Sequence, residues 1–75
     1  MRNDRVQQFG ERVRHLRQKA KLSQEELAAR VGIHRTYMGG VERGERNLGL
    51  INILRIADAL DVSLASLFKG IERDT

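Results

Sequence analysis

Apolar side chains recur at steps of three and four residues along most of the chain, the spacing that places them on one face of an α-helix. The first helix is predicted to begin near Asn3 or Asp4 and to end at about Lys19. Its buried stripe is expected to comprise Val6, Phe9, Val13 and Leu16. Because no proline interrupts the pattern, the sequence predicts an all-α fold.

Two further helices are predicted in the second half of the chain. One is expected from about Leu50 to Leu60, and Ser63 can cap a short last helix that ends near Gly70. The buried set of the longer helix is expected to comprise Ile53, Leu54, Ala57 and Leu60. Residues 71–75 should form a frayed tail. A chain of 75 residues has room for one small domain with one core and no separate ligand pocket.

Residues 22–44 predict two short helices joined by a tight turn. Ser23 can cap the first of them, and Glu26 three residues later completes a capping box. Gly32 follows at the position where a left-handed backbone commonly ends a helix, and Gly44 offers a second stop. The inward positions of the two helices are Leu27, Ala28, Val31, Met38 and Val41.

The outward face of the second short helix has basic and hydroxyl groups at its N-terminal end and no bulk in its middle. This face consists of Arg35, Thr36, Gly39, Gly40 and Arg43. Each glycine in a helix interior costs about 0.8–1.0 kcal/mol relative to alanine. Close approach of the backbone to DNA or to the preceding helix would explain the two glycines, and loose packing is the alternative. Such a face suits contact with a polyanion.

The segment resembles the helix-turn-helix of the phage-repressor (XRE/Cro-type) family of bacterial DNA-binding proteins. The likeness covers roughly residues 9–68, and its matching parts are residues 22–28, 31–32, 37–38, 41–44, 46–47, 54–60 and 63–64. The chain length and the elements Arg35-Thr36-Tyr37 and Arg46-Asn47 further resemble the controller proteins of restriction–modification systems. The resemblance implies a compact five-helix, repressor-like domain, with its helix-turn-helix at about residues 23–44.

The resemblance also implies that Arg35, Thr36 and Tyr37 contact base edges of double-stranded operator DNA. The helix from about His34 to Arg43 would be ~15 Å long, which fits within the major groove over a few base pairs. Arg35 can bind guanine O6 and N7 in a bidentate manner, which discriminates by roughly 1–3 kcal/mol. The Tyr37 ring could pack on the preceding helix while its hydroxyl reaches DNA, and packing alone would explain it equally well.

Seven further residues are expected to contact the DNA backbone and thereby to position the protein without reading sequence. They are Gln24, His34, Gly40, Arg43, Arg46, Asn47 and Asn52. Gln24 lies in the first turn of its helix, where the amide groups of a helix N-terminus favour a phosphate. His34 stands where many relatives have a serine, threonine or aspartate cap, and simple surface exposure would also explain it.

Glu42 would repel DNA phosphates if its side chain pointed outward. The resemblance pairs it with an arginine on the first predicted helix, so we assign Arg17 and Glu42 to a structural ion pair. Removing one partner of such a pair would leave the other charge without compensation and destabilise the fold.

The apolar side chains exceed what one small core requires, and the excess clusters late in the chain. Ile51 would expose an apolar group on the first turn of its helix, and the other members are Leu64, Leu67, Phe68 and Ile71. Such a patch usually marks an interface. One helix reads only a short half-site, so a two-fold homodimer that reads a palindrome is expected, through the helices over about residues 50–69.

The net charge of +4 is unevenly distributed. Residues 1–21 hold seven basic and two acidic side chains (+5), residues 22–47 hold four of each, and residues 48–75 hold three basic and four acidic (−1). A basic end favours nucleic acid or another anionic surface, but the solvated helices of bacterial proteins are often basic too. The charge alone therefore does not distinguish nucleic-acid binding from an ordinary basic surface. The arrangement of residues 22–47 is what favours nucleic-acid binding.

The composition argues against several other chemistries. There is no cysteine for a disulfide or a thiolate metal site, His15 and His34 lack ligand spacing, and no apolar run approaches the roughly 18 residues of a membrane span. No Ser–His–acid set or glycine-rich phosphate loop is present either. We therefore expect no enzyme activity, metal, cofactor, small-molecule ligand, membrane contact or secretory signal, and a cytoplasmic location.

Together these features predict a sequence-specific transcriptional regulator whose own concentration is the signal, an autoregulatory controller of a restriction–modification operon. Such a protein would activate, repress, or do both at different occupancies, and RNA polymerase is then a further candidate partner. Two alternatives stay open. One is a generic phage-type repressor, and the other is an antitoxin-like protein whose late apolar patch holds a toxin.

Overall fold

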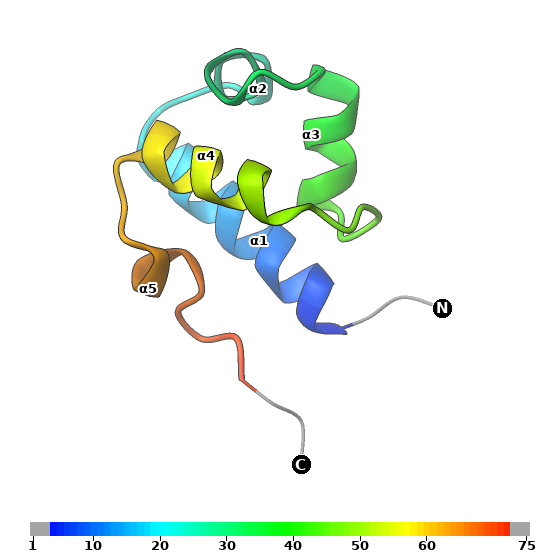
Figure 1. Cartoon of the computed structure of the whole chain (residues 1–75), viewed down its shortest axis with the longest axis vertical. Helices are drawn as coiled ribbons and strands as arrows, with labels where there is room; N and C mark the ends of the chain where they lie inside the picture. Colours follow the sequence, from blue (N-terminus) through cyan, green and yellow to red (C-terminus); the bar gives the residue numbers. More distant parts are fainter. Residues whose placement is uncertain (1–3, 73–75) are drawn as a thin grey trace.

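The computed structural model describes residues 4–72, which form five helices and no strand (Figure 1). These are α1 (Asp4–Lys19), α2 (Gln24–Val31), α3 (Arg35–Glu42), α4 (Leu50–Leu60) and α5 (Leu64–Leu67). The predicted all-α fold is confirmed, as are the ends of the first four helices to within about one residue. The alternative first residue of the chain's first helix, Asn3, and the predicted tail beyond residue 72 lie outside the described residues.

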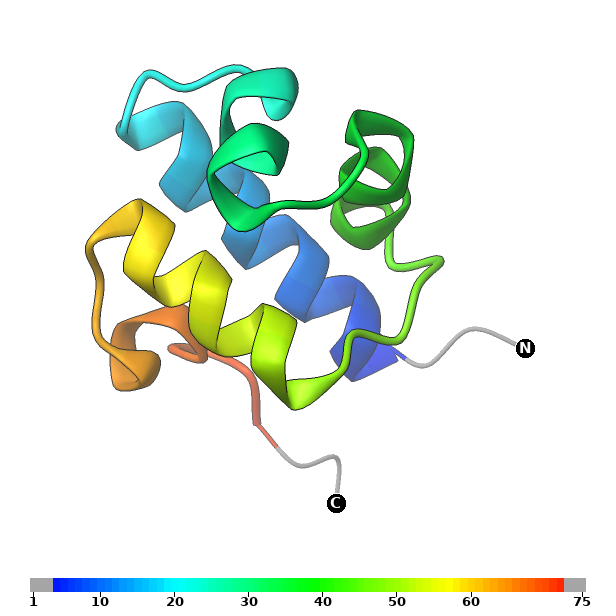
Figure 2. The ribbon, with the colours of Figure 1, turned by 45° about the horizontal axis from the view of Figure 1, so that its top comes forward.

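The helices enclose one core, with α2 packed against α3 and α4, and α1 packed against α3 and α5. In Figure 2, α2 and α3 lie on one side of α1 and α4, and α5 lies on the opposite side. The buried apolar side chains are Val13, Leu16, Leu27, Ala28, Val31, Met38, Val41, Ile56, Ala57, Leu60 and Leu67. Every helix contributes to this set, so α2 and α3 are held against the rest of the molecule.

The buried face of α4 differs from the prediction at two positions. Leu54 was expected in the core and is 39% exposed, whereas Ile56 is completely buried. Apolar residues occur at so many positions of α4 that two overlapping stripes satisfy helical spacing, and only the packing against α2 and α5 selects between them. The selected stripe leaves Leu54 on the outer face of α4.

Gly10 allows α1 and α3 to approach closely. A Cβ atom placed on Gly10 would lie 2.7 Å from the backbone carbonyl oxygen of Glu42, closer than a real Cβ contact. The sequence indicated only a small loss of helix propensity at this position. The structure shows that the glycine lets the last turn of α3 pack directly on α1.

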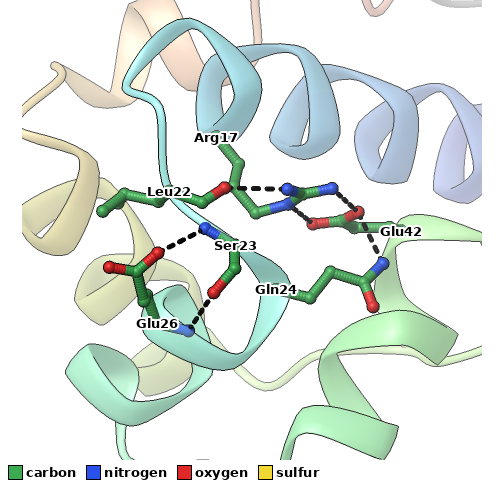
Figure 3. A network of polar contacts seen from close by, with 6 residues as sticks. All are labelled: Arg17, Leu22, Ser23, Gln24, Glu26 and Glu42. Atoms are coloured by element: carbon green, nitrogen blue, oxygen red, sulfur yellow. Dashed lines mark hydrogen bonds and ion pairs between the residues drawn. The ribbon is translucent and has the colours of Figure 1, made fainter.

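The predicted capping box at the start of α2 is confirmed (Figure 3). The Ser23 hydroxyl accepts a hydrogen bond of 3.0 Å from the Glu26 backbone N–H, and the Ser23 N–H donates one of 2.9 Å to Glu26 Oε1. The hydrogen bond from the Ser23 N–H, together with the neighbouring Ser23 hydroxyl, holds the pKa of the Glu26 carboxyl below its usual value. Gly32 ends α2 in the predicted left-handed conformation, with φ of 86°.

The last helix is shorter than predicted. Ser63 caps it as expected, since its hydroxyl accepts a hydrogen bond from the Ser66 N–H, but α5 ends at Leu67 instead of near Gly70. The backbone leaves the helix at Phe68 and continues as turns to Gly70, which has φ of 84°. Capping residues at the start of a helix are a strong local signal, whereas this end depends on how the following residues pack.

Candidate nucleic-acid interface

The turn between α2 and α3 is built from local backbone hydrogen bonds. The N–H groups of Gly32 and Ile33 both donate to the carbonyl oxygen of Ala28, which closes α2. His34 then adopts an extended conformation and becomes the N-cap of α3. The two helices and this turn form the helix-turn-helix that the sequence predicted.

His34 acts as a side-chain cap. Its Nδ1 accepts a hydrogen bond of 3.1 Å from the backbone N–H of Thr36. This role resembles that of the serine or aspartate that commonly begins a helix, because an acceptor satisfies one of the unpaired N–H groups of the first turn. The imidazole is therefore more than an exposed surface group, while its contact with DNA stays a prediction.

Arg35 and Thr36 project from the first turn of α3 and are exposed. Arg35 Nη1 lies 3.1 Å from Glu25 Oε2 on α2, an ion pair in which both side chains are about two-thirds exposed or more, at 67% and 71%. Exposed pairs of this kind contribute about 0–1 kcal/mol, so the guanidinium can exchange this partner for another. The structure brings two of the three predicted base-contacting residues to an accessible position at the N-terminal end of α3.

Tyr37, the third predicted base-contacting residue, is half-buried at the edge of α3. The guanidinium carbon of Arg46 lies 5.5 Å from the centroid of its ring, a cation–π arrangement. The ring therefore contacts a residue that follows α3. Two residues predicted separately as DNA contacts thus lie together.

Gly39 and Gly40 are both buried, which was not expected for the outward face of α3. A Cβ on Gly39 would lie 3.1 Å from Arg43 Nη1 and 3.4 Å from Gln24 Oε1, and a Cβ on Gly40 would lie 2.9 Å from Arg46 Cγ. Gly40 is thus covered by a side chain in this structure, and its contact with the DNA backbone stays a prediction. The arginine side chain that follows α3 folds back and covers the glycine.

Arg17 and Glu42 form the predicted buried ion pair (Figure 3). Arg17 Nε and Nη2 donate to the two carboxylate oxygens of Glu42 at 2.7 and 3.0 Å, a bidentate geometry. Arg17 Nη1 also donates to the backbone carbonyl of Leu22 at 2.8 Å. The pair therefore joins α1, the end of α3 and the residue before the cap of α2.

Gln24 also belongs to this network, a contact that the sequence pattern did not predict. Its Nε2 donates to Glu42 Oε1 at 3.0 Å, and its amide oxygen points away from that carboxylate (Figure 3). The amide at the start of α2 is thus oriented by a carboxylate at the end of α3. No sequence spacing indicates this contact, because the two residues lie on different helices.

The remaining predicted backbone contacts lie on the segment after α3 and at the start of α4. Arg43 is exposed, and its Nη2 pairs with Glu45 at 3.1 Å. Asn47 is exposed, and Asn52 is half-buried in the first turn of α4. Gly49 caps α4 without a side-chain hydrogen bond. In the sequence these positions follow the end of α3, whereas Arg35 and Thr36 stand at its start.

Of the five residues of the predicted apolar patch, three are exposed, Ile71 is half-buried and Leu67 is buried. Leu67 is completely buried in the core, so its assignment to an interface is wrong. Ile51, Leu64 and Phe68 are 66%, 45% and 41% exposed, and Leu50 and Leu54 on α4 are exposed as well. Leu67 occupies the inward position of the single turn of α5, because one residue of so short a helix must anchor it to α1.

Within residues 4–72, none of the helices combines the length and apolar character needed to cross a membrane. The same residues contain no group of three or more His, Cys, Asp or Glu side chains placed to hold a metal ion. The polar side chains discussed above gather instead around α2 and α3, where basic, hydroxyl and amide groups lie beside one another.

Comparisons with known proteins agree with this geometry. The helix-turn-helix family model HTH_3 matches residues 13–67. The control protein C.MunI from Mycoplasma sp. is 40% identical over 96% of this chain and 99% of its own length, and C.BamHI from Bacillus amyloliquefaciens is 49% identical over 72% and 68%. The crystal structure of the restriction–modification controller protein C.AhdI from Aeromonas hydrophila has a TM-score of 0.79 and 53% identity, covering 85% of this chain and 96% of its own. The chain therefore belongs to the helix-turn-helix family, in which it is similar to the control proteins of restriction–modification systems.

Proposed function

We propose that this DNA-binding regulator of the helix-turn-helix family controls a restriction–modification operon, in the cytoplasm, by binding the operator upstream of its own gene. The observation that carries the proposal is the pair of exposed side chains, Arg35 and Thr36, at the start of α3, a helix whose other end a buried ion-pair network anchors to α1. A rigid support of this kind is what a base-reading side chain requires.

In the proposed complex α3 lies in the major groove with its N-terminal turn against the base edges. Arg35 exchanges Glu25 for guanine O6 and N7, while Thr36 contacts a base or a phosphate. Phosphates on either side are held by Gln24 at the start of α2 and by the residues after α3, namely Arg43, Arg46, Asn47 and Asn52. Glu42 does not repel the DNA, because Arg17 compensates its charge inside the molecule.

Fluorescence anisotropy with the DNA upstream of the gene, compared with scrambled DNA over a salt series, tests this proposal. We expect a preference of about 10³-fold or more for the upstream DNA and a steep loss of affinity as salt rises. Equal and weak binding to every sequence would contradict it, and a protein partner would then be the better explanation of the fold.

The same proposal includes a homodimer, because one short helix reads only a half-site. Its support is the set of exposed apolar side chains on two adjacent helices: Leu50, Ile51 and Leu54 on α4, Leu64 on α5 and Phe68 directly after it. Large apolar side chains exposed together usually mark a contact surface. A second copy that covers them would place two recognition helices on a palindrome.

Replacing Ile51 with serine is expected to weaken self-association by roughly tenfold to a hundredfold, since each copy loses the burial of one large apolar side chain. Sedimentation equilibrium of wild type, Ile51→Ser and Gln18→Ser checks this result. Gln18 is an exposed polar residue on α1 and serves as the control. A wild-type protein that is monomeric at tens of micromolar would argue against the dimer, and a stoichiometric co-purifying protein would favour the antitoxin-like alternative.

A further inference from the structure

Gly40 occupies a position on α3 where a side chain would point away from the core, yet it is buried. The cover is the side chain of Arg46, which comes from the segment after the helix and lies across it. A Cβ atom on Gly40 would be 2.9 Å from Arg46 Cγ, 3.2 Å from Nε and 3.6 Å from Cδ. The contact therefore runs along the stem of the arginine, and a methyl group could not be accommodated by moving only the guanidinium.

The guanidinium end of the Arg46 side chain also has a defined contact. The Arg46 guanidinium lies over the Tyr37 ring, with 5.5 Å between the guanidinium carbon and the ring centroid. A cation–π contact of this kind attracts the charge of the guanidinium and does not require its five N–H donors to bond to the ring. Donors therefore stay available for phosphate oxygens, so the contact with Tyr37 does not compete with a phosphate contact.

We propose that Gly40 is a positioning residue for Arg46. The missing side chain lets the arginine lie flat on α3 and reach Tyr37, so that its guanidinium is ordered at the edge of the recognition helix before DNA arrives. Ordering a long side chain in advance lowers the entropic cost of binding. The inference rests on the proposed DNA-binding function and explains why a helix of eight residues retains a glycine at this position.

The first test is made without DNA, by NMR of the wild type, Gly40→Ala and Tyr37→Leu. In the wild type we expect upfield ring-current shifts of the Arg46 Hδ and Hε protons. Both variants should return these resonances toward ordinary arginine values, because one displaces the stem and the other removes the ring. Unchanged Arg46 shifts in Gly40→Ala would overturn the inference whatever the protein does with DNA.

The second test is operator binding by the full chain. Gly40→Ala should bind about 3- to 10-fold more weakly than the wild type, the factor expected when one rotamer-rich side chain has to be ordered on binding. Its melting temperature should be equal or higher, because alanine favours a helix interior over glycine. Weaker binding by a variant that is at least as stable is a result that a purely structural role would not produce.

A double-mutant cycle separates this role from direct approach of the α3 backbone to DNA. In an Arg46→Ala background the added methyl group has no arginine stem to displace, so Gly40→Ala should change operator affinity by less than about 2-fold. An equal loss in both backgrounds would mean that the methyl meets the DNA itself and would overturn the inference. Absence of selective binding by the wild type would instead contradict the proposed function. The NMR test of the Arg46 position is made without DNA, so its result does not depend on that function.

Discussion

Replacing Arg35 with alanine is expected to remove most of the protein's preference for its operator while the fold stays intact. The side chain is exposed, and its ion pair with Glu25 contributes at most about 1 kcal/mol to stability. A bidentate arginine–guanine contact discriminates by roughly 1–3 kcal/mol, and a two-fold dimer makes the contact twice. The two contacts together supply roughly 2–6 kcal/mol, which corresponds to about 30-fold to 2 × 10⁴-fold in selectivity, a range that includes the expected preference of about 10³.

Anisotropy titrations of wild type, Arg35→Ala and Arg14→Ala against operator and scrambled DNA measure this effect. Arg14 is exposed on α1, so its replacement removes the same charge away from the recognition helix. Arg35→Ala should lower affinity for the operator far more than for scrambled DNA, whereas Arg14→Ala should lower both slightly and equally. If Arg35→Ala kept the full operator preference, with circular dichroism showing a folded protein, α3 would not read the operator through this residue.

Removal of Glu42 is expected to have the largest effect on stability. The Glu42→Ala variant leaves the buried Arg17 guanidinium without its carboxylate, which typically costs about 3–5 kcal/mol. Small domains have total stabilities of roughly 5–15 kcal/mol, so the variant would be partly unfolded or melt at least about 12 °C lower. The loss should extend to α2, because Arg17 also holds the Leu22 carbonyl and Glu42 holds the Gln24 amide.

Urea denaturation followed by circular dichroism at 222 nm tests this, with Glu45→Ala as the matched control. Glu45 is also a glutamate paired with an arginine, but its pair with Arg43 is exposed, and the expected loss is below about 1 kcal/mol. The double variant Arg17→Met, Glu42→Leu should recover much of the lost stability, because apolar side chains of similar volume replace both charges. Similar losses in Glu42→Ala and Glu45→Ala would show that burial does not distinguish the two pairs.

These two predictions concern different parts of one arrangement. Arg35 has an exposed ion pair that it can exchange for a contact with DNA. The buried Arg17–Glu42 pair keeps the start of α2 and the end of α3 in place. Variants of Arg17 or Glu42 should therefore lose specific and non-specific DNA binding together as the protein unfolds, whereas a variant of Arg35 should lose specificity alone.

The helices and the turn between α2 and α3 could be predicted from the sequence because their determinants are local. Helical spacing of apolar residues, the Ser23–Glu26 capping box and the glycine after α2 act between residues at most about four positions apart. The same local signals placed Arg35 and Thr36 on the outward face of α3. The Arg17–Glu42 pair joins residues 25 positions apart, and only the family resemblance indicated it.

The tertiary structure decided which apolar residues are buried and which polar side chains meet. Leu54 and Ile56 both satisfy helical spacing, and Leu67 lies in an apolar cluster, so their exposure depends on which face of each short helix packs on its neighbours. The Gln24–Glu42 hydrogen bond joins two separate helices, and the contacts of Arg46 with Gly40 and Tyr37 join α3 to the segment after it. Local spacing determines what a helix can present, and only the packing of helices against one another determines what that face contacts.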